Sequence, residues 1–161
     1  MARGTLDVRI CGGRNLSNPN KEGKICCIVY YKDQQKRTEA IYCDGPDPEW
    51  NETLLFTIAD HVEELKVRVH DGDYVTEEEV GHCDINIEGL LRDGGENRIE
   101  PTSYDVWRNN EGNYGNVTVE LHFHPGNFGL INDDDRLRTY VKMIWWMKIK
   151  NKQTSTYCFV I

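Results

Sequence analysis

The sequence predicts an all-β protein: an eight-stranded antiparallel β-sandwich followed by a basic, aromatic C-terminal extension. Three observations predict it. Apolar residues recur at every second position in several short segments, as in a strand with one buried face. Gly, Pro and Asn punctuate these segments evenly, and no helical pattern of useful length separates them. At 161 residues, 39% of them hydrophobic, the chain can bury one core. We therefore expect a sandwich domain over residues 1–125 and a tail over residues 126–161.

The N-terminal half carries four strand signals. Leu6, Val8 and Ile10 alternate with polar residues, whereas residues 24–32 form a continuous β-rich run. The breaker at residues 44–48, Asp-Gly-Pro-Asp-Pro, then ends one strand before the next begins. The strands expected in this half are residues 6–10, 24–32, 36–42 and 52–58.

The C-terminal half carries four more strand signals. Leu65, Val67 and Val69 alternate with Lys, Arg and His, and the alternation over residues 117–123 is the cleanest in the sequence. The strands expected here are residues 65–70, 80–87, 103–108 and 117–123, with one helical turn near residues 88–91.

Carboxylates crowd the segment that directly follows residues 65–70. Like charges repel unless solvent or a cation screens them. Calcium is a hard cation that takes several oxygen ligands from one flexible loop. The loop by itself fits a calcium site and a solvated acidic turn equally well. Its acids are Asp71, Asp73, Glu77, Glu78 and Glu79, with no Lys or Arg among them.

Composition narrows the class of protein. No apolar run is long enough to span a bilayer or to serve as a signal peptide, so we expect a cytosolic protein. The six cysteines form no Cys-x-x-Cys pair, which predicts reduced thiols and argues against zinc. No nucleophile elbow or phosphate-binding loop is present either. These patterns indicate a binding protein and not an enzyme.

Charge is divided unevenly along the chain. Residues 136–161 hold six basic residues and no acid, which leaves a net charge of −14 on residues 1–135. This asymmetry is typical of a domain joined to an interaction segment. Because the domain is so acidic, we expect no nucleic-acid partner except through the tail.

Five motifs in order resemble the C2 domain, a family of lipid-binding modules, and the resemblance covers residues 3–125. It implies a sandwich in the permuted order called type II, whose loops at one end bind calcium and insert between anionic lipid headgroups. The motifs are Gly4-Thr5-Leu6-Asp7-Val8, Asn15-Leu16, Asp47-Pro48-Glu49-Trp50-Asn51-Glu52, the His70-Asp71-Gly72-Asp73 loop that closes at Val80-Gly81, and Gly115-Asn116-Val117-Thr118-Val119.

The resemblance also implies which residues would hold calcium. In the second loop Asp71 and Asp73 match the family pattern, and Glu78 takes a place usually held by Asp. In the first loop the two expected Asp positions fall on Asn20 and Cys26, which offer an uncharged oxygen and a soft thiol. We therefore expect at most one weakly bound calcium ion; calcium-independent behaviour is the equal alternative.

Basic side chains suggest a second lipid contact. Lys32, Lys36 and Arg37 are expected on neighbouring strands, where the family's basic patch binds phosphoinositides; an ordinary solvated face is the competing interpretation.

Two other features have structural interpretations. Trp50, in a turn just before a strand, is interpreted as a packing residue. His122 and His124 share the outward face of the last strand at a spacing that suits a metal. Two such ligands without a third acid or thiol beside them usually mean an exposed strand, so they are interpreted as exposed residues.

The tail mixes interfacial aromatic residues with cations, including Lys142, Lys148, Lys150 and Lys152. The sequence ends Cys158-Phe159-Val160-Ile161, which resembles a prenylation box with Cys158 as acceptor. A lipid chain and nearby cations would together hold an acidic domain on an anionic membrane. The alternative is a β-hairpin that packs on the sandwich or on a second subunit.

Two functions follow from these interpretations. In the first, the chain is a peripheral module on the cytosolic face of membranes that binds anionic phospholipid. In the second, it is a soluble interaction domain that docks a protein partner or self-associates through residues 136–161.

Overall fold

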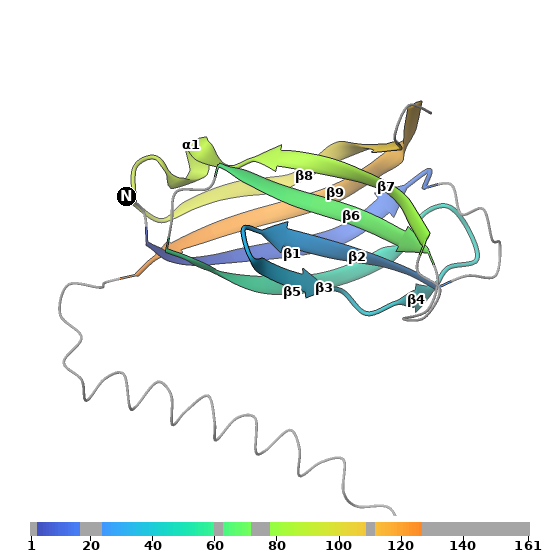
Figure 1. The fold of residues 1–161 in the computed structure, drawn as a ribbon, viewed down its shortest axis with the longest axis horizontal. Coiled ribbons are helices and arrows are strands. Elements are labelled where there is room, and N and C mark those ends of the chain that lie inside the picture. Colours follow the sequence, from blue (N-terminus) through green and yellow to red (C-terminus); the bar gives the residue numbers. More distant parts are fainter. Residues whose placement is uncertain (1–2, 17–23, 60–62, 72–77, 109–111, 127–161) are drawn as a thin grey trace, which may run out of the picture. The chain divides into compact units, whose positions relative to one another are not determined.

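The computed structural model describes residues 3–16, 24–59, 63–71, 78–108 and 112–126. Within them, every strand pairs antiparallel to its neighbours (Figure 1). The elements are β1 (Gly4–Arg14), β2 (Lys24–Tyr31), β3 (Gln34–Arg37), β4 (Ile41–Tyr42), β5 (Glu49–Ile58), β6 (Glu64–Asp71), β7 (Glu78–Asn86), α1 (Glu88–Leu91), β8 (Asn97–Arg108) and β9 (Gly112–Pro125).

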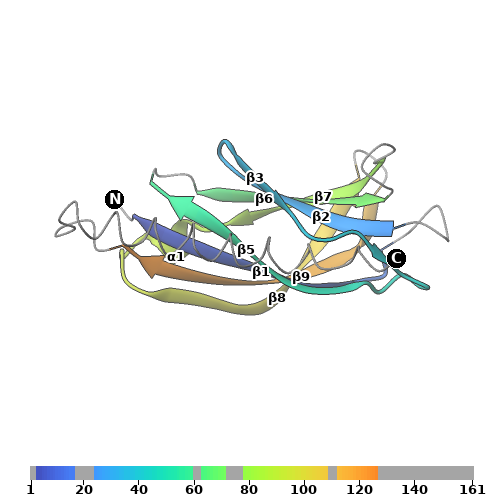
Figure 2. The same cartoon turned by 90° about the horizontal axis from the view of Figure 1, so that it is seen from below.

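The strands form two packed layers. Their order is β3-β2-β6-β7-β8-β9-β1-β5, and β4 pairs with β2 off this path. Figure 2 shows β2, β3, β6 and β7 in one layer and β8, β9, β1 and β5 in the other. The path passes from one layer to the other where β7 meets β8, at the pair His82 and Trp107. The predicted all-β antiparallel sandwich is confirmed.

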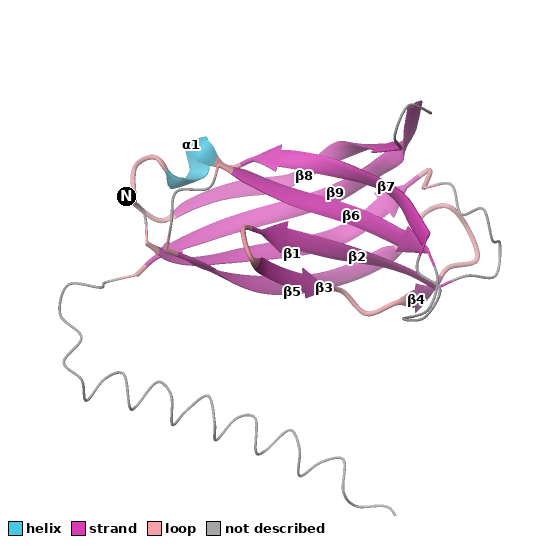
Figure 3. Ribbon diagram, viewed as in Figure 1, coloured by secondary structure: helices cyan, strands magenta, loops and turns pink. Residues whose placement is uncertain are grey.

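Helix contributes little to the described residues. The four-residue α1 lies beside the strands and coincides with the helical turn predicted near residues 88–91 (Figure 3). In the described part of the chain no helix has the length and apolarity that crossing a bilayer requires.

The structure divides one predicted strand into two. In place of a strand over residues 36–42 it has β3 and β4, so the described residues form nine strands and not eight. Thr38, which lies between them, is buried. Its backbone amide donates to the carbonyl oxygen of Cys27 at 2.9 Å, and its hydroxyl oxygen accepts from the Cys27 amide at 3.0 Å. These long-range bonds hold the chain on β2 while the strand pairing is interrupted.

β8 begins earlier than the alternation indicates, at Asn97 and not at residue 103. Its first half pairs with β9 up to Phe123 and contains a register shift between Ile99 and Thr102. Pro101 lies within that shift, where a residue without an amide hydrogen is tolerated. Most of this half is exposed, so it carries no apolar pattern.

The core lies between the two layers, and burial explains two kinds of sequence pattern. On β9 buried Val, Leu and Phe alternate with partly exposed residues, because that strand has one covered face. On β2 both faces are covered, so its sequence is a continuous apolar run. Five cysteines lie in the described residues and all are free. Burial raises the pKa of Cys83 to about 12, so this thiol stays protonated at neutral pH and acts as a packing residue.

Gly81 allows the close contact between β7 and β8. A Cβ atom at this position would lie 2.7 Å from Cγ1 of Val106 and 2.9 Å from the carbonyl oxygen of Trp107. The second neighbour is backbone and cannot move aside without disturbing the strand. A side chain at position 81 would therefore push apart the strands that join the two layers.

We expect Gly81→Ala to lower the free energy of unfolding by about 1–3 kcal/mol, because the added methyl group overpacks this contact. Gly95→Ala is the matched control, since a Cβ there meets no heavy atom within 4 Å. The control should stay within about 0.5 kcal/mol of the wild type. Urea denaturation measures both variants, and equal stability of the two would contradict this account of the β7 and β8 contact.

Candidate functional site

One end of the sandwich, which we call the loop tip, gathers several strand ends. Its residues are Arg14 to Leu16, Lys24, Tyr42, Asp71, Glu78 and the β8 to β9 hairpin from Trp107 to Tyr114, as far as these are described. The register joins them, since Lys24 lies opposite Tyr42, Ile25 opposite Asp71, and Asp71 opposite Glu78. In Figure 1 this is the right-hand end, where β4 and the meeting point of β6 and β7 lie.

Asp71 stands at the centre of the predicted calcium site. It is the last residue of β6, only 2% exposed, and lies between Ile25 of β2 and Glu78 of β7. The structure therefore brings the backbones of two predicted ligands, Asp71 and Glu78, directly opposite each other. Asp73 and Asn20, the other two, lie outside the described residues.

Cys26 occupies one of the two positions where the resemblance implies a carboxylate in the first loop. It is fully buried on β2, opposite His70, and Nη2 of Arg37 lies 3.3 Å from its sulfur, donating a hydrogen bond. A guanidinium group thus accompanies the thiol. The positive charge of the Arg37 guanidinium disfavours the binding of a calcium ion nearby.

The described residues fall short of a calcium cage. Calcium takes about six to eight oxygen ligands, and Asp71 is the predicted ligand whose side chain the structure describes at the loop tip. The remaining predicted oxygens belong to residues 17–23 and 72–78. A calcium site at this end of the sandwich would therefore need oxygens from those two segments.

The predicted basic patch is not brought together on one face. Lys36 lies opposite Val29 and Arg37 opposite Ile28, and successive residues of a strand point to opposite faces of the sheet. Lys32 lies in the turn after β2, with φ of 53°. Arg37 is directed to Cys26, so the three cations do not make one surface.

Exposed aromatic residues at the loop tip were not anticipated from the sequence. Tyr42 is 74% exposed and Trp107 is 52% exposed. Cations accompany the aromatic rings, with Nζ of Lys24 5.1 Å from the Tyr42 ring centre and Cζ of Arg108 5.8 Å from that of Tyr114. We call Lys24, Tyr42, Trp107, Arg108 and Tyr114 the aromatic rim. The pattern contained a signal for Trp107, because Val106 beside it is buried and the strand must turn Trp107 outward.

Asp47 joins two of the sequence motifs at the base of the loop tip. Its carboxylate accepts from the Asn15 amide at 2.8 Å and from Nη1 of Arg14 at 3.1 Å. The Asn15 bond, followed by the Arg14 bond, lowers the pKa of the Asp47 carboxyl. These bonds favour the ionised carboxylate, so they are intact at neutral pH and are lost as the pH falls through that lowered pKa. They hold Asn15, whose φ is 52°, at the end of β1.

The Trp50 side chain is hydrogen-bonded to the start of β2. The side chain is 7% exposed, and its indole Nε1 donates to the carbonyl oxygen of Ile25 at 3.1 Å. The interpretation of Trp50 as a packing residue is confirmed.

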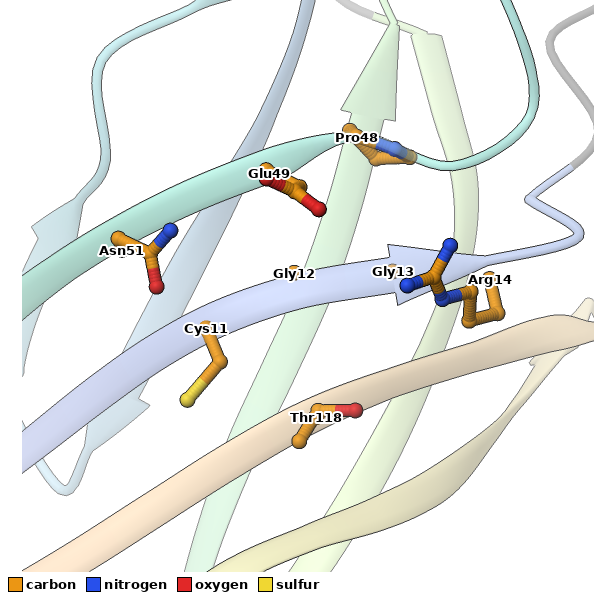
Figure 4. A pocket seen from close by; sticks show the side chains of 8 residues that line it. All are labelled: Cys11, Gly12, Gly13, Arg14, Pro48, Glu49, Asn51 and Thr118. Atoms are coloured by element: carbon orange, nitrogen blue, oxygen red, sulfur yellow. The ribbon is translucent and has the colours of Figure 1, made fainter.

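A pocket of about 250 Å³ lies beside this base, where β1 shifts register between Ile10 and Gly12. Figure 4 shows side chains from β1, β5 and β9 around it, with Arg14 at one end and Cys11 at the other. Arg14 already binds Asp47, and burial raises the pKa of Cys11, so this thiol is not activated. The pocket therefore presents no convergent set of reactive groups. Its lining residues are Cys11, Gly12, Gly13, Arg14, Pro48, Glu49, Asn51 and Thr118.

Comparison with known proteins agrees with this architecture. The model of the C2 domain family matches residues 4–102. The chain is 31% identical over 144 residues to elicitor-responsive protein 3 of Oryza sativa subsp. japonica, covering 86% of this chain and 90% of the rice protein. It is also 31% identical over 128 residues to the 16 kDa phloem protein 2 of Arabidopsis thaliana, covering 78% of this chain and 84% of that protein.

A solved structure supports the same assignment. The C2 domain-containing protein from a putative elicitor-responsive gene superposes with a TM-score of 0.67 at 30% identity, covering 80% of this chain and 95% of that one. The matches to the rice protein and to this structure extend over most of both partners. The chain belongs to the C2 domain family.

Proposed function

We propose that this C2 domain is a peripheral membrane-binding module that docks its loop tip on anionic phospholipid, at the cytosolic face of membranes, with weak or no dependence on calcium. One observation carries the proposal: the exposed ring of Tyr42 lies with Lys24 at the strand ends where Asp71 lies, and the exposed ring of Trp107 lies one residue before the end of β8.

The chemistry of the aromatic rim suits a lipid surface. Tyr and Trp favour the zone between headgroups and acyl chains, because one part of each ring system is apolar and another is polar. Lys24 and Arg108 lie within reach of anionic headgroups when the rings enter that zone, and each cation near such a surface contributes about 1 kcal/mol. The rim thus combines a small apolar contact with an electrostatic one.

Calcium has a secondary role in this proposal. Asp71, Asp73, Glu78 and Asn20 would hold one ion weakly and reduce the negative charge that faces the membrane. The Cys26 thiol, which is a poor ligand for calcium, and the Arg37 guanidinium bound to it would both weaken the binding of that ion.

The tail supplies a second attachment in the proposal. Lys142, Lys148, Lys150 and Lys152 would offset the net charge of −14 on residues 1–135, which an anionic surface repels. A prenyl group on Cys158 would add a reversible hydrophobic anchor. Both lie outside the described residues and follow from the sequence.

Vesicle binding tests the role of the aromatic rim. The full chain made in bacteria, which lack prenylation, should sediment with vesicles of phosphatidylserine and phosphatidylcholine but not with phosphatidylcholine alone. We expect Tyr42→Ser/Trp107→Ser to lower the partition coefficient about tenfold, since two interfacial rings together contribute on the order of 1.4 kcal/mol.

Leu55→Ser is the matched control, because Leu55 is 54% exposed and lies on β5 opposite Asp7, away from the loop tip. This variant should bind as the wild type does. Equal loss in both variants, or no lipid binding by the wild type, would contradict the proposal. Concentration-dependent self-association without lipid binding would instead favour the soluble interaction domain.

Calorimetry tests the calcium ligands. We expect the wild type to bind one calcium ion with a dissociation constant of about 10⁻⁴–10⁻³ M, the weak end of the range for calcium modules. Asp73→Asn should abolish the heat, and Asp44→Asn, an exposed acid before β5, should not. No heat in the wild type would leave lipid binding independent of calcium and would remove the ion from the proposal.

Intact mass tests the lipid anchor. Expressed in cells that prenylate proteins, the wild-type chain should gain the mass of one isoprenoid group, and Cys158→Ser should not. Membrane fractionation of the same two proteins should show a shift of Cys158→Ser toward the supernatant. An unmodified wild-type mass would remove the anchor and leave the rim and the cations of the tail.

A further inference from the structure

Two histidines from the last described strand and an acid from the first meet on the outer face of the β1 and β9 pair. His122 and His124 alternate with the buried Leu121 and Phe123, so both imidazole rings leave the core side of β9. β1 lies beside β9 with Asp7 directly opposite His122. One ligand atom from each of Asp7, His122 and His124 lies within 4.8 Å of the others.

The spacing is close to that of a metal site. Nε2 of His124 is 3.1 Å from Oδ2 of Asp7, and tetrahedral zinc with bonds of about 2.0–2.1 Å separates its ligand atoms by roughly 3.3 Å. The two imidazole rings lie with their centres 3.9 Å apart, tilted by 46°. The three ligand atoms therefore lie close to the separation that one ion requires, and rotation of the side chains would have to close the remaining gap.

A fourth side chain supports His122. Oε1 of Glu96, just before β8, lies 2.9 Å from Nε2 of His122. A carboxylate that binds the second nitrogen of a metal-ligating histidine fixes its orientation and raises its basicity. Arg98, opposite His122 on β8, is paired with Glu120 and with Glu100, so its charge is directed to other carboxylates.

The donor set selects the kind of ion. Two imidazoles and one carboxylate suit late divalent transition metals such as Zn²⁺, whereas calcium prefers an all-oxygen site. The three side chains keep between 30% and 40% of their surface exposed, which leaves room for water as a further ligand. The absence of a Cys-x-x-Cys pair from the sequence argues only against zinc sites with thiolate ligands. It does not bear on a site built from histidine and aspartate.

We propose that Asp7, His122 and His124, oriented by Glu96, bind one Zn²⁺-class ion. The site lies toward the end of the sandwich opposite the loop tip, where Gly4 pairs with Pro125 and the Gly126 amide donates to the Arg3 carbonyl oxygen. The bound ion joins the first strand of the domain to its last. It is separate from the calcium-type site at Asp71 and does not depend on lipid binding.

Zinc titration of the full chain tests the site. The chain carries no polyhistidine tag and its thiols are kept reduced with a phosphine that does not chelate. Calorimetry of the wild type should show a saturable one-to-one heat with Zn²⁺ that equimolar Ca²⁺ does not displace. His124→Gln and Asp7→Asn should each weaken zinc binding by at least about tenfold, and the zinc-induced rise in Tm should shrink with it.

His82→Gln is the matched control, because Nδ1 of His82 also contacts a carboxylate, Oε1 of Glu79, at 3.1 Å but His82 is not in the group of potential ligands found among the described side chains. Its zinc affinity should equal that of the wild type. Bound Co²⁺ should show d–d absorption without the charge-transfer band of a thiolate ligand, which separates this site from the cysteines.

Two results would overturn the proposal. One is a wild-type zinc heat no larger than that of His122→Gln/His124→Gln. The other is a cobalt spectrum with thiolate character that the histidine variants leave unchanged. All of the substituted residues are partly exposed, and circular dichroism of each variant confirms that the comparison is made between folded proteins.

Discussion

The antiparallel pairing of β1 with both β9 and β5 is the constraint on which the other features depend. It places the beginning and the end of the described chain side by side, and it carries the apolar faces of three strands into one core. At one end of β1 it sets Asn15 against Asp47. Near the other end it sets Asp7 against His122. One strand thus positions both candidate sites, although they lie at different parts of the sandwich.

Strands with one buried face could be predicted from the sequence because burial imposes a local period of two. That holds for β1, β6 and β9, where Leu6, Leu65 and Val117 begin clear alternations. It fails where the determining contact is distant. The break between β3 and β4 depends on Thr38 bonding to Cys27, and the first half of β8 is mostly exposed.

In the candidate sites, too, the contacts between residues distant in the sequence could not be predicted. The acidic segment after β6 was visible in the sequence because its carboxylates are neighbours along the chain, and the structure sets Asp71 opposite Glu78. The approach of Arg37 to Cys26 and of Asp7 to the two histidines depends on strand register. Register joins residues far apart in the sequence, so a single chain read in order does not reveal them. The basic patch was expected because Lys32, Lys36 and Arg37 belong to neighbouring strands, whereas the pleat separates Lys36 from Arg37.

The contact at Gly81 has a consequence for how this scaffold accommodates change. A backbone carbonyl and a valine methyl group occupy the space where a side chain at position 81 would begin, so a larger residue there would separate the two layers at that corner. Packing therefore restricts which residue can stand at this corner. The segments that connect the strand ends elsewhere do not take part in this contact, so their residues can change without disturbing it.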